Sequence, residues 1–350
     1  MQKTTLSGVI AIGIASSLAG TAMAETLTSA RTAEAPTIDG AMEEAWSAAE
    51  PLGIAVDMTP YEPSNGYAGL EKSTVTMRSM HDDERIYFLF MWDDPTHSLE
   101  RQPWVKQADG SWQRLRQDDG TGHDNTYYED KFAVLWDINA RGFAKTGCAA
   151  ACHMADNGMI DGIEAGSPGR KFTTRPGQSI DMWHWKSVRT GPVGQIDDQF
   201  IDDTTDAAAN SGWGRKGDSK TGGGYADNVS EDKTVPAFMP ADGSTGAFWL
   251  HKADAVPFED SFAAGDVLPA MLVEPFAGSR GDILAEANWA DGQWTLEVTR
   301  PLVTSGENAE TQDVQFDDLE QEYPFGVAVF DNSQINHIFH EGVLNLRFGG

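Results

Sequence analysis

The chain has 350 residues and a formal net charge of −29 at pH 7, from 54 acidic and 25 basic residues. A surface this acidic argues against nucleic acid and anionic lipid as partners, because both require positive charge. It suits solubility in a salty medium, or docking to a basic patch on another protein.

The first 24 residues predict a signal peptide. Lys3 precedes an apolar run that is shorter than the roughly 20 residues needed to span a bilayer. Ala22, Met23 and Ala24 then supply the small-x-small pattern of a signal peptidase site. We therefore expect cleavage after Ala24 and export, with the bacterial periplasm as the destination. Removing 24 residues from 350 leaves 326, and the formal charge becomes −30 because Lys3 is lost. We expect no membrane span in the mature chain.

The rest of the chain is dominated by predicted strands. A helical pattern covers 40–51, with Asp39 placed to cap it. The clearest alternating runs rich in Val, Phe, Tyr and Trp, which are typical of half-buried strands, are 73–80, 85–92, 131–138, 293–300 and 325–331. The turn signals "HDDE" and "ADGQ" predict hairpins. Together these patterns predict a mainly β protein, an antiparallel β-sandwich with few short helices.

The middle of the chain, from about 142 to 245, is dense in Gly, Asp, Ser and Asn. Loops this long inside a compact domain are usually functional or disordered, and this stretch contains both cysteines of the chain. No internal repeat is visible. We predict a single domain over 25–350 that carries a loop-rich insertion at about 142–245.

Cys148, Cys152 and His153 form a C-x-x-x-C-H pattern. A disulfide is one interpretation, since export implies an oxidising compartment, although so small a loop adds little stability. A metal site would need further ligands. The third interpretation is covalent haem, in which both thiols add to the porphyrin vinyl groups and the histidine binds the iron. The usual attachment spacing is C-x-x-C-H, one residue shorter, so the residues favour haem and leave the other two interpretations open.

Several segments resemble known β-sandwich families. Residues 35–54 are similar to the opening of DOMON-type and family 9 carbohydrate-binding sandwiches. The stretch 77–104 is closer to the haem-binding γ subunits of ethylbenzene dehydrogenase and dimethylsulfide dehydrogenase. The similarity continues in the same order through 130–138, 181–199 with its distinctive "DMWHWK", and 325–333. The resemblance runs from about residue 35 to the C-terminus and implies a DOMON-like sandwich.

The cysteines distinguish this chain from those γ subunits, which hold a non-covalent haem b between a methionine and a lysine. Their methionine follows the strand that resembles 130–138, and here that region leads into the cysteines. The resemblance therefore implies the c-type branch of the family, with one haem c attached through Cys148 and Cys152. It also implies that His153 is the proximal iron ligand.

The resemblance places the second iron ligand near the C-terminus, where the γ subunits have a lysine. His340 lies nearest to that place and is the favoured distal ligand, with His337 as second choice. Strand alternation puts these two side chains on opposite faces. His184, Met239 or an open site remain as further alternatives.

The sequence around His184 leads to two further expectations, one for its neighbouring tryptophans and one for nearby basic residues. We expect Trp183 and Trp185 to lie on opposite faces of a strand, with His184 sharing its face with neither. Four basic residues in the nearby loops would either pair with haem propionates or face solvent and offset carboxylates: Lys171, Arg175, Lys186 and Arg189.

A haem iron with two protein ligands leaves no site for substrate, so we expect outer-sphere electron transfer. The resemblance implies a periplasmic monohaem cytochrome that exchanges electrons with a redox partner, such as a molybdenum enzyme or another cytochrome. Such a protein is not an enzyme by itself. Two alternatives stay open. One is a non-haem, carbohydrate-binding sandwich, suggested by the N-terminal segment and 11 tryptophans. The other is a five-coordinate haem sensor or enzyme.

Overall fold

The computed structural model describes residues 25–60, 67–118, 122–151, 159–160, 163–164 and 170–350. The predicted signal peptide, Cys152 and His153 lie outside the described residues.

The largest sheet of the described residues has 13 strands. Eleven of them follow one path, and β2 (Leu52–Val56) and β22 (Ile338–Phe339) pair beside it with β3 and β21. In spatial order the path is β12 (Arg215–Gly217), β11 (Asp197–Ile201), β10 (Ile180–Lys186), β7 (Lys131–Asp137), β21 (Tyr323–Phe330), β23 (Leu344–Phe348), β1 (Glu25–Arg31), β3 (Ser73–His81), β4 (Arg85–Asp93), β20 (Gln293–Pro301) and β19 (Leu284–Ala290).

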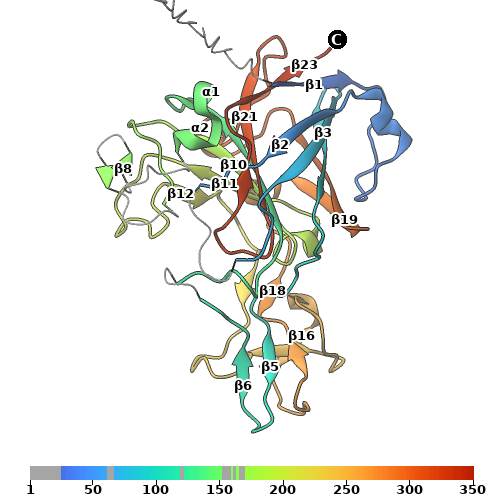
Figure 1. The fold of residues 1–350 in the computed structure, drawn as a ribbon, viewed down its shortest axis with the longest axis vertical. Helices are drawn as coiled ribbons and strands as arrows, with labels where there is room; N and C mark the ends of the chain where they lie inside the picture. The colour runs from blue at the N-terminus through green and yellow to red at the C-terminus, as the bar shows by residue number, and fades with distance from the viewer. Residues whose placement is uncertain (1–24, 61–66, 119–121, 152–158, 161–162, 165–169) are drawn as a thin grey trace, which may run out of the picture.

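This sheet folds over so that its two halves face each other across one aromatic core (Figure 1). Phe88 of β4 lies 5.7 Å from the rings of both Trp136 on β7 and Trp183 on β10. The far edges also meet, because the backbone N–H of Ile196 donates to the carbonyl of Ile283 at 3.1 Å. The prediction of a mainly β sandwich is confirmed. Its pairing is antiparallel except at β1, which runs parallel to both β23 and β3.

The predicted strands agree with the observed ones to within two residues at each end. Both predicted hairpins are present, since β3 pairs antiparallel with β4 and β19 with β20. In the second turn, Asp291 and Gly292 have φ values of 52° and 81°. Two successive positive φ values are required by the tight turn that matches strand twist, which is why an Asp-Gly pair signals it.

The helices of the described chain are all short. The helix predicted over 40–51 is only a 3-10 turn, η1 (Glu44–Ala48), and Asp39 does not cap it. Instead, the indole N–H of Trp46 donates to Glu297 at 2.6 Å, which fixes this segment to β20. The other helices are α1 (Phe143–Thr146), η2 (Gly147–Ala150), η3 (Gly191–Val193), η4 (Lys252–Asp254), η5 (Ser279–Gly281) and α2 (Ala309–Gln312). Within the described ranges, no helix has the length and apolar character needed to cross a membrane.

A smaller lobe extends from one end of the sandwich, at the bottom of Figure 1. It has its own apolar cluster, which includes Trp104, Trp112 and Leu268. Its strands are β5 (Trp104–Lys106), β6 (Trp112–Arg114), β13 (Ala226–Asp227), β14 (Phe238–Pro240), β15 (Leu250–His251), β16 (Ala255–Pro257), β17 (Val267–Leu268) and β18 (Met271–Val273).

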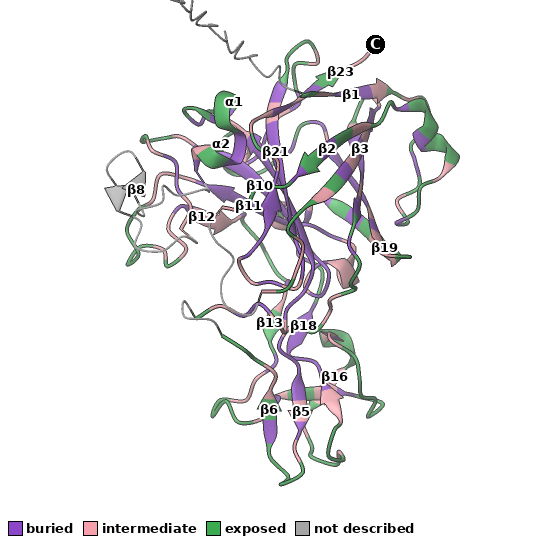
Figure 2. Cartoon of the chain, viewed as in Figure 1, coloured by how far each residue is buried: buried purple, intermediate pink, exposed green. Residues whose placement is uncertain are grey.

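The region predicted as an insertion, about 142–245, contributes to several parts of the molecule. It contains β10 and β11 of the main sheet, the hairpin β8 (Met159–Ile160) with β9 (Ile163–Glu164), and β13 and β14 of the lobe. Figure 2 shows mostly buried residues along the strands in the body of the sandwich, and mostly exposed residues in the loops of the lobe. The division of the chain into a single domain stays a prediction.

Candidate functional site

Strand β10 divides its side chains between two environments. Trp183 and Trp185 both point into the aromatic core between the two halves of the sheet. The expectation that they lie on opposite faces is therefore wrong, because residues two apart on a strand share a face. His184 and Met182 point the other way, and Met182 packs in a second apolar cluster that contains Cys148.

Cys148 packs on this second face, against the backbone of β21. A Cβ atom added to Gly326 would lie only 2.5 Å from the Cys148 Sγ, so a glycine is needed at that contact. The neighbouring residues Ala328 and Ala133, which pair across β21 and β7, are also small. We call this surface the cysteine face and define it as Ala133, Leu135, Met182, His184, Gly326, Ala328 and Phe330.

His184 is a buried hydrogen-bond donor on the cysteine face. Its Nδ1 lies 2.9 Å from Nη2 of Arg215, and a guanidinium can only donate. Nδ1 therefore accepts and Nε2 carries the proton, and this Nε2–H has no hydrogen-bond partner among the described residues. Burial, followed by the charges of Lys186 and Arg215, holds the pKa of His184 well below its usual value. The His184 side chain is thus neutral, and its Nε2–H can donate a hydrogen bond to an acceptor placed on this face.

His337 also lies on the cysteine face. Its ring stacks on Phe330 with 4.5 Å between the ring centroids, and its Nδ1 lies 2.8 Å from the carbonyl of Ile335. A carbonyl only accepts, so Nδ1 is protonated and Nε2 carries the lone pair. This is the arrangement by which proteins orient a metal-binding histidine. Burial lowers the pKa of His337 to about 3, which keeps the ring neutral.

The structure separates His340 and Met239 from this face. Phe339 of β22 packs in the same cluster as Cys148, and alternation then directs His340 to the opposite side, as predicted for His337 and His340. His340 is half-buried, and its Nδ1 donates to the carbonyl of Ala55 at 3.0 Å. Met239 packs in the cluster of the lobe.

Four basic side chains gather at the His184 end of the cysteine face. Lys186 pairs with the buried Asp197, and Arg189 pairs with the buried Glu129 at 2.5 Å. Burial lowers the pKa of Lys186 to about 7 and that of Lys131 well below its usual value, so these two amines do not carry a full charge at neutral pH. An anion placed beside them would favour their protonated forms and would also meet the two guanidinium groups. We call this group the basic cluster: Lys131, Lys186, Arg189 and Arg215.

Two aromatic rings hold the basic cluster in place. The Arg189 guanidinium lies 5.8 Å from the ring centre of Tyr128 and 5.1 Å from that of Tyr225. The Lys131 and Lys186 amines each lie 5.0 Å from one of the same two rings. Cation–ring contacts of this kind fix long basic side chains in the positions where an anion would meet them.

The outcome for the four basic residues expected near the haem segment is mixed. Lys186 is fully buried and the Arg189 side chain is only 11% exposed, so for these two the solvent-facing interpretation is wrong. Both do offset carboxylates, Asp197 and Glu129, as that interpretation also held. Arg175 is exposed, and Lys171 is half-buried. Sequence reasoning missed two members of the cluster. Lys131 could have been found, because it alternates with Ala133 and Leu135. Arg215 lies in a Gly-rich stretch with no periodic pattern to place it.

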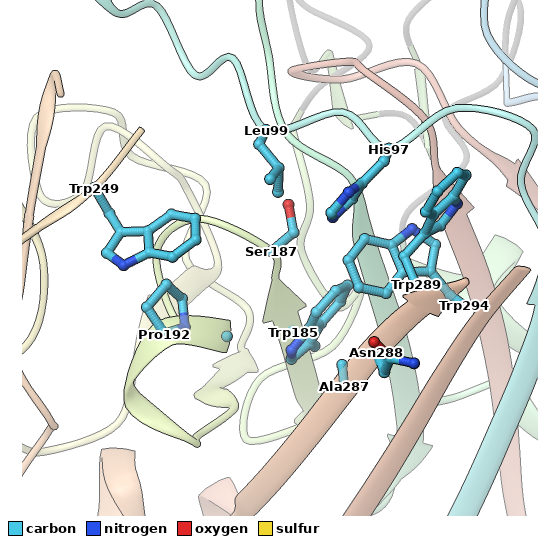
Figure 3. Close-up of a pocket in the computed structure, with 11 residues that line it drawn as sticks. His97, Leu99, Trp185, Ser187, Pro192, Trp249, Ala287, Asn288, Trp289 and Trp294 are labelled. Atoms are coloured by element: carbon cyan, nitrogen blue, oxygen red, sulfur yellow. The ribbon is translucent and has the colours of Figure 1, made fainter. Parts of the chain in front are cut away.

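A second site lies on the core side of β10, where four tryptophans surround a pocket of about 260 Å³. Figure 3 shows Trp249 across the pocket from His97 and Trp289. The His97 and Trp289 rings are stacked with 5.0 Å between their centres and a 7° tilt, and the Trp289 N–H donates to the Asp94 carbonyl at 2.9 Å. We call it the tryptophan pocket.

The cysteine face fits a haem by its own chemistry. It offers the Cys148 thiol beside the small residues Gly326, Ala328 and Ala133, and a neutral histidine, His337, whose lone pair is on Nε2. It also offers the buried N–H of His184 beside the basic cluster. Haem propionates are anionic, and buried anions require paired cations and donors. The other half of the attachment motif, Cys152 and His153, lies outside the described residues.

Three comparisons with known proteins complete the description. A family model described as ethylbenzene dehydrogenase matches residues 43–342. A search of curated protein sequences gives no match. Among solved structures, a family 9 carbohydrate-binding module from Caldicellulosiruptor kristjanssonii in complex with glucose is similar, with 8% identity and a TM-score of 0.33 over 93% of this chain and 95% of that one. A putative carbohydrate-binding protein from Bacteroides uniformis ATCC 8492 has 9% identity and a TM-score of 0.34, over 93% of this chain and 100% of that one.

Proposed function

The chain belongs to the ethylbenzene dehydrogenase family, and from this premise we propose that it is a monohaem c-type cytochrome that carries electrons to or from a redox partner. In this proposal Cys148 and Cys152 form the thioethers and His153 is the proximal iron ligand. One observation carries the proposal: a thiol, the buried N–H of His184 and the basic cluster share one face of the sheet.

The residues of the cysteine face have distinct tasks in this proposal. Gly326 and its small neighbours let the ring lie flat on the strands, with Cys148 against the backbone. The His184 N–H and the basic cluster neutralise and orient the propionates. The haem supplies a one-electron couple, whose potential depends on the axial ligands and on burial.

We propose His337 as the distal ligand, ahead of the sequence-based choice His340. His337 shares the face of Cys148, and its protonated Nδ1 puts the lone pair, which a metal requires, on Nε2. His340 lies on the other side of its strand. His184 is less suited, since the Arg215 donor leaves its proton on Nε2. Two imidazole ligands would give a low-spin iron with a lower potential than histidine and methionine give.

The proposed place of action is the periplasm, after cleavage behind Ala24. The strongly acidic chain would dock to a basic patch on its partner, a molybdenum enzyme or another cytochrome. If His153 and His337 both bound the iron, they would leave no position on it for a substrate. The protein would therefore act as a carrier or a subunit of an oxidoreductase complex, and not as an enzyme by itself.

A protein matured in a periplasm with c-type haem assembly tests the proposal. We expect a Soret band, a c-type pyridine haemochrome, and haem that stays on the polypeptide in a denaturing gel. The matched variant is Cys148→Ala with Cys152→Ala, which should lose all gel-retained haem. Haem retained by the double variant, or a wild type without a Soret band, would overturn the proposal. A high-spin wild type that binds carbon monoxide would favour the five-coordinate alternative.

The tryptophan pocket supports a second candidate function, the binding of a small ligand such as a sugar. Its half-buried Trp249 and Trp289 offer ring faces on which a sugar ring can pack. Calorimetric titration with glucose and short glucans tests this candidate. Two results together would establish sugar binding in place of the cytochrome function. The wild type would bind the sugar and show no Soret band, and Trp289→Ala would not bind the sugar.

A further inference from the structure

Five aspartates gather on the core side of β10 and β11, behind the cysteine face. Adjacent residues of β11 point in opposite directions, so Asp197 reaches the basic cluster and Asp198 faces the other way. We call this second group the buried acid cluster. Its members come from five separate places in the chain: Asp181 on β10, Asp198 on β11, Asp218 after β12, Asp282 at the end of η5, and Asp313 after α2.

The geometry of the cluster matches an ion site. One carboxylate oxygen from each of Asp198, Asp218 and Asp313 lies within 4.8 Å of the others, and all three residues are buried. Asp198 is fully buried, and its carboxyl contacts that of Asp282. Within the described residues, no N–H or neutral O–H group donates to either of its carboxylate oxygens. The same holds for both oxygens of Asp218 and for one oxygen each of Asp181, Asp282 and Asp313. An unpaired buried carboxylate is costly, so the cluster needs a cation or protons.

Among the described residues, too few basic side chains contact the buried acid cluster to neutralise it. Arg300 is fully buried and approaches Asp181, with 3.5 Å between Nη1 and Oδ2. The other two Arg300 nitrogens that have partners donate to backbone carbonyls. The nearby Arg280 is paired with Asp197.

A second acidic group provides the contrast. Asp94, Asp130 and Asp331 also lie within 4.8 Å of one another and are buried. Asp130 accepts hydrogen bonds from the backbone N–H groups of Ser98 and Asn332. Asp331 and Asp94 also accept from backbone or hydroxyl donors, and of this group only Asp94 Oδ2 is unpartnered within the described chain. Among the described residues, protein donors reach five of the six carboxylate oxygens of this group, but only one of the six oxygens of Asp198, Asp218 and Asp313.

From this contrast we propose that the buried acid cluster binds one Ca²⁺ ion, with Asp198, Asp218 and Asp313 as its central ligands. Ca²⁺ takes 6–8 oxygen ligands in flexible geometry, whereas Mg²⁺ retains water and prefers fewer carboxylates. Asp282 lines a surface pocket of about 430 Å³ together with Thr304 and Glu307, which gives an entry path. The ion would tie β10 and β11, the strands that carry His184 and Asp197, to the segments that end at Asp282 and Asp313.

The test uses the full mature protein, dialysed against a chelator and then titrated with CaCl₂ or MgCl₂. We expect about one Ca²⁺ per chain by elemental analysis, and a rise in Tm on the order of 5 °C at a hundredfold excess over Kd. MgCl₂ should raise Tm much less. These readouts follow the ion and the fold, so they remain informative whether or not the haem proposal holds. A wild type that binds no Ca²⁺ and shows no rise in Tm, or an equal rise with MgCl₂, would overturn the assignment.

Asp198→Asn tests whether Asp198 binds an ion or only fills space, because the substitution removes one negative charge and keeps the shape of the side chain. In chelator we expect its Tm to be equal to or above that of the wild type, since repulsion is reduced. With CaCl₂ we expect its affinity for the ion to fall by about 10–100-fold. Asp94→Asn in the second acidic group is the matched control and should keep the full Ca²⁺ response. Loss of that response in Asp94→Asn, or its retention in Asp198→Asn, would refute the site.

Discussion

The cysteine face and the tryptophan pocket lie on opposite sides of β10, and they differ in chemistry. On one side, His184 presents a single N–H beside a basic cluster, above a floor of small residues. On the other side, Trp185 and its aromatic neighbours fill the core and line a pocket. Both environments come from one alternating stretch, "IDMWHWK". One strand can therefore serve two different sites, because adjacent side chains leave it in opposite directions.

The first prediction concerns His337 on the cysteine face, where a substitution should change the spin state of the haem iron. His337→Ala should remove the distal ligand, producing a high-spin spectrum and new carbon monoxide binding while the haem stays covalently attached. His340→Ala is the matched control and should leave the absorption spectrum nearly unchanged, because that ring lies away from Cys148. The reverse result would restore His340 as the ligand. A methionine–iron charge-transfer band in the oxidised wild type would reject both histidines.

A second prediction concerns the floor of the cysteine face. Gly326→Ala should lower the free energy of unfolding by about 1–3 kcal/mol, because the added Cβ would lie 2.5 Å from the Cys148 sulfur and overpack the site. Denaturant unfolding measures the stability, and the haem-to-protein absorbance ratio reports attachment. Gly53→Ala on β2 is the control, since nothing lies within 4 Å of its added Cβ. If Gly326→Ala and Gly53→Ala change the free energy of unfolding equally, Cys148 does not pack closely on β21.

The sequence predicted the sandwich well because its strands carry a local signal. Residues 85–92 and 293–300 alternate and end at turns, and both lie in the sheet as expected. The helix expected at 40–51 failed because a long-range bond from Trp46 to Glu297, which no local pattern reveals, holds the segment to β20.

The site was less predictable, because it depends on side chains that converge from distant segments. Its thiol could be found from the cysteine spacing, and His184 from the distinctive motif around it. The preference between His337 and His340 required the pairing of β22 with β21, which sets the face of each ring. Arg215, which fixes the His184 tautomer, is 31 residues away in the chain. Adjacent aspartates such as Asp197 and Asp198 can be assigned to separate clusters only once the neighbouring strands are known.

A third prediction, confined to alkaline pH, concerns Asp94 on the tryptophan side of the sheet, whose carbonyl binds Trp289. Asp94 is fully buried, and burial together with the charge of Asp331 raises its pKa to about 7, from 3.8 for an ordinary aspartate. Between these two values the folded protein holds a proton that the unfolded chain has lost. The contribution of Asp94 to stability is therefore highest below about pH 4 and is lost as pH rises towards 7. Asp94→Asn should match the wild type at pH 4 and exceed its free energy of unfolding at pH 8 by about 1–3 kcal/mol.

Urea unfolding at pH 4, 6 and 8 measures this difference, with the exposed neighbour Asp93→Asn as the control. The control should show no pH-dependent difference from the wild type, because Asp93 is solvated. A rise confined to Asp94→Asn would show that the acidic group under the tryptophan pocket holds a proton in the folded protein. A constant difference between Asp94→Asn and the wild type across this pH range would mean that Asp94 is already ionised at pH 4. The donors around it, the N–H and hydroxyl of Thr96, would then be enough to hold its charge.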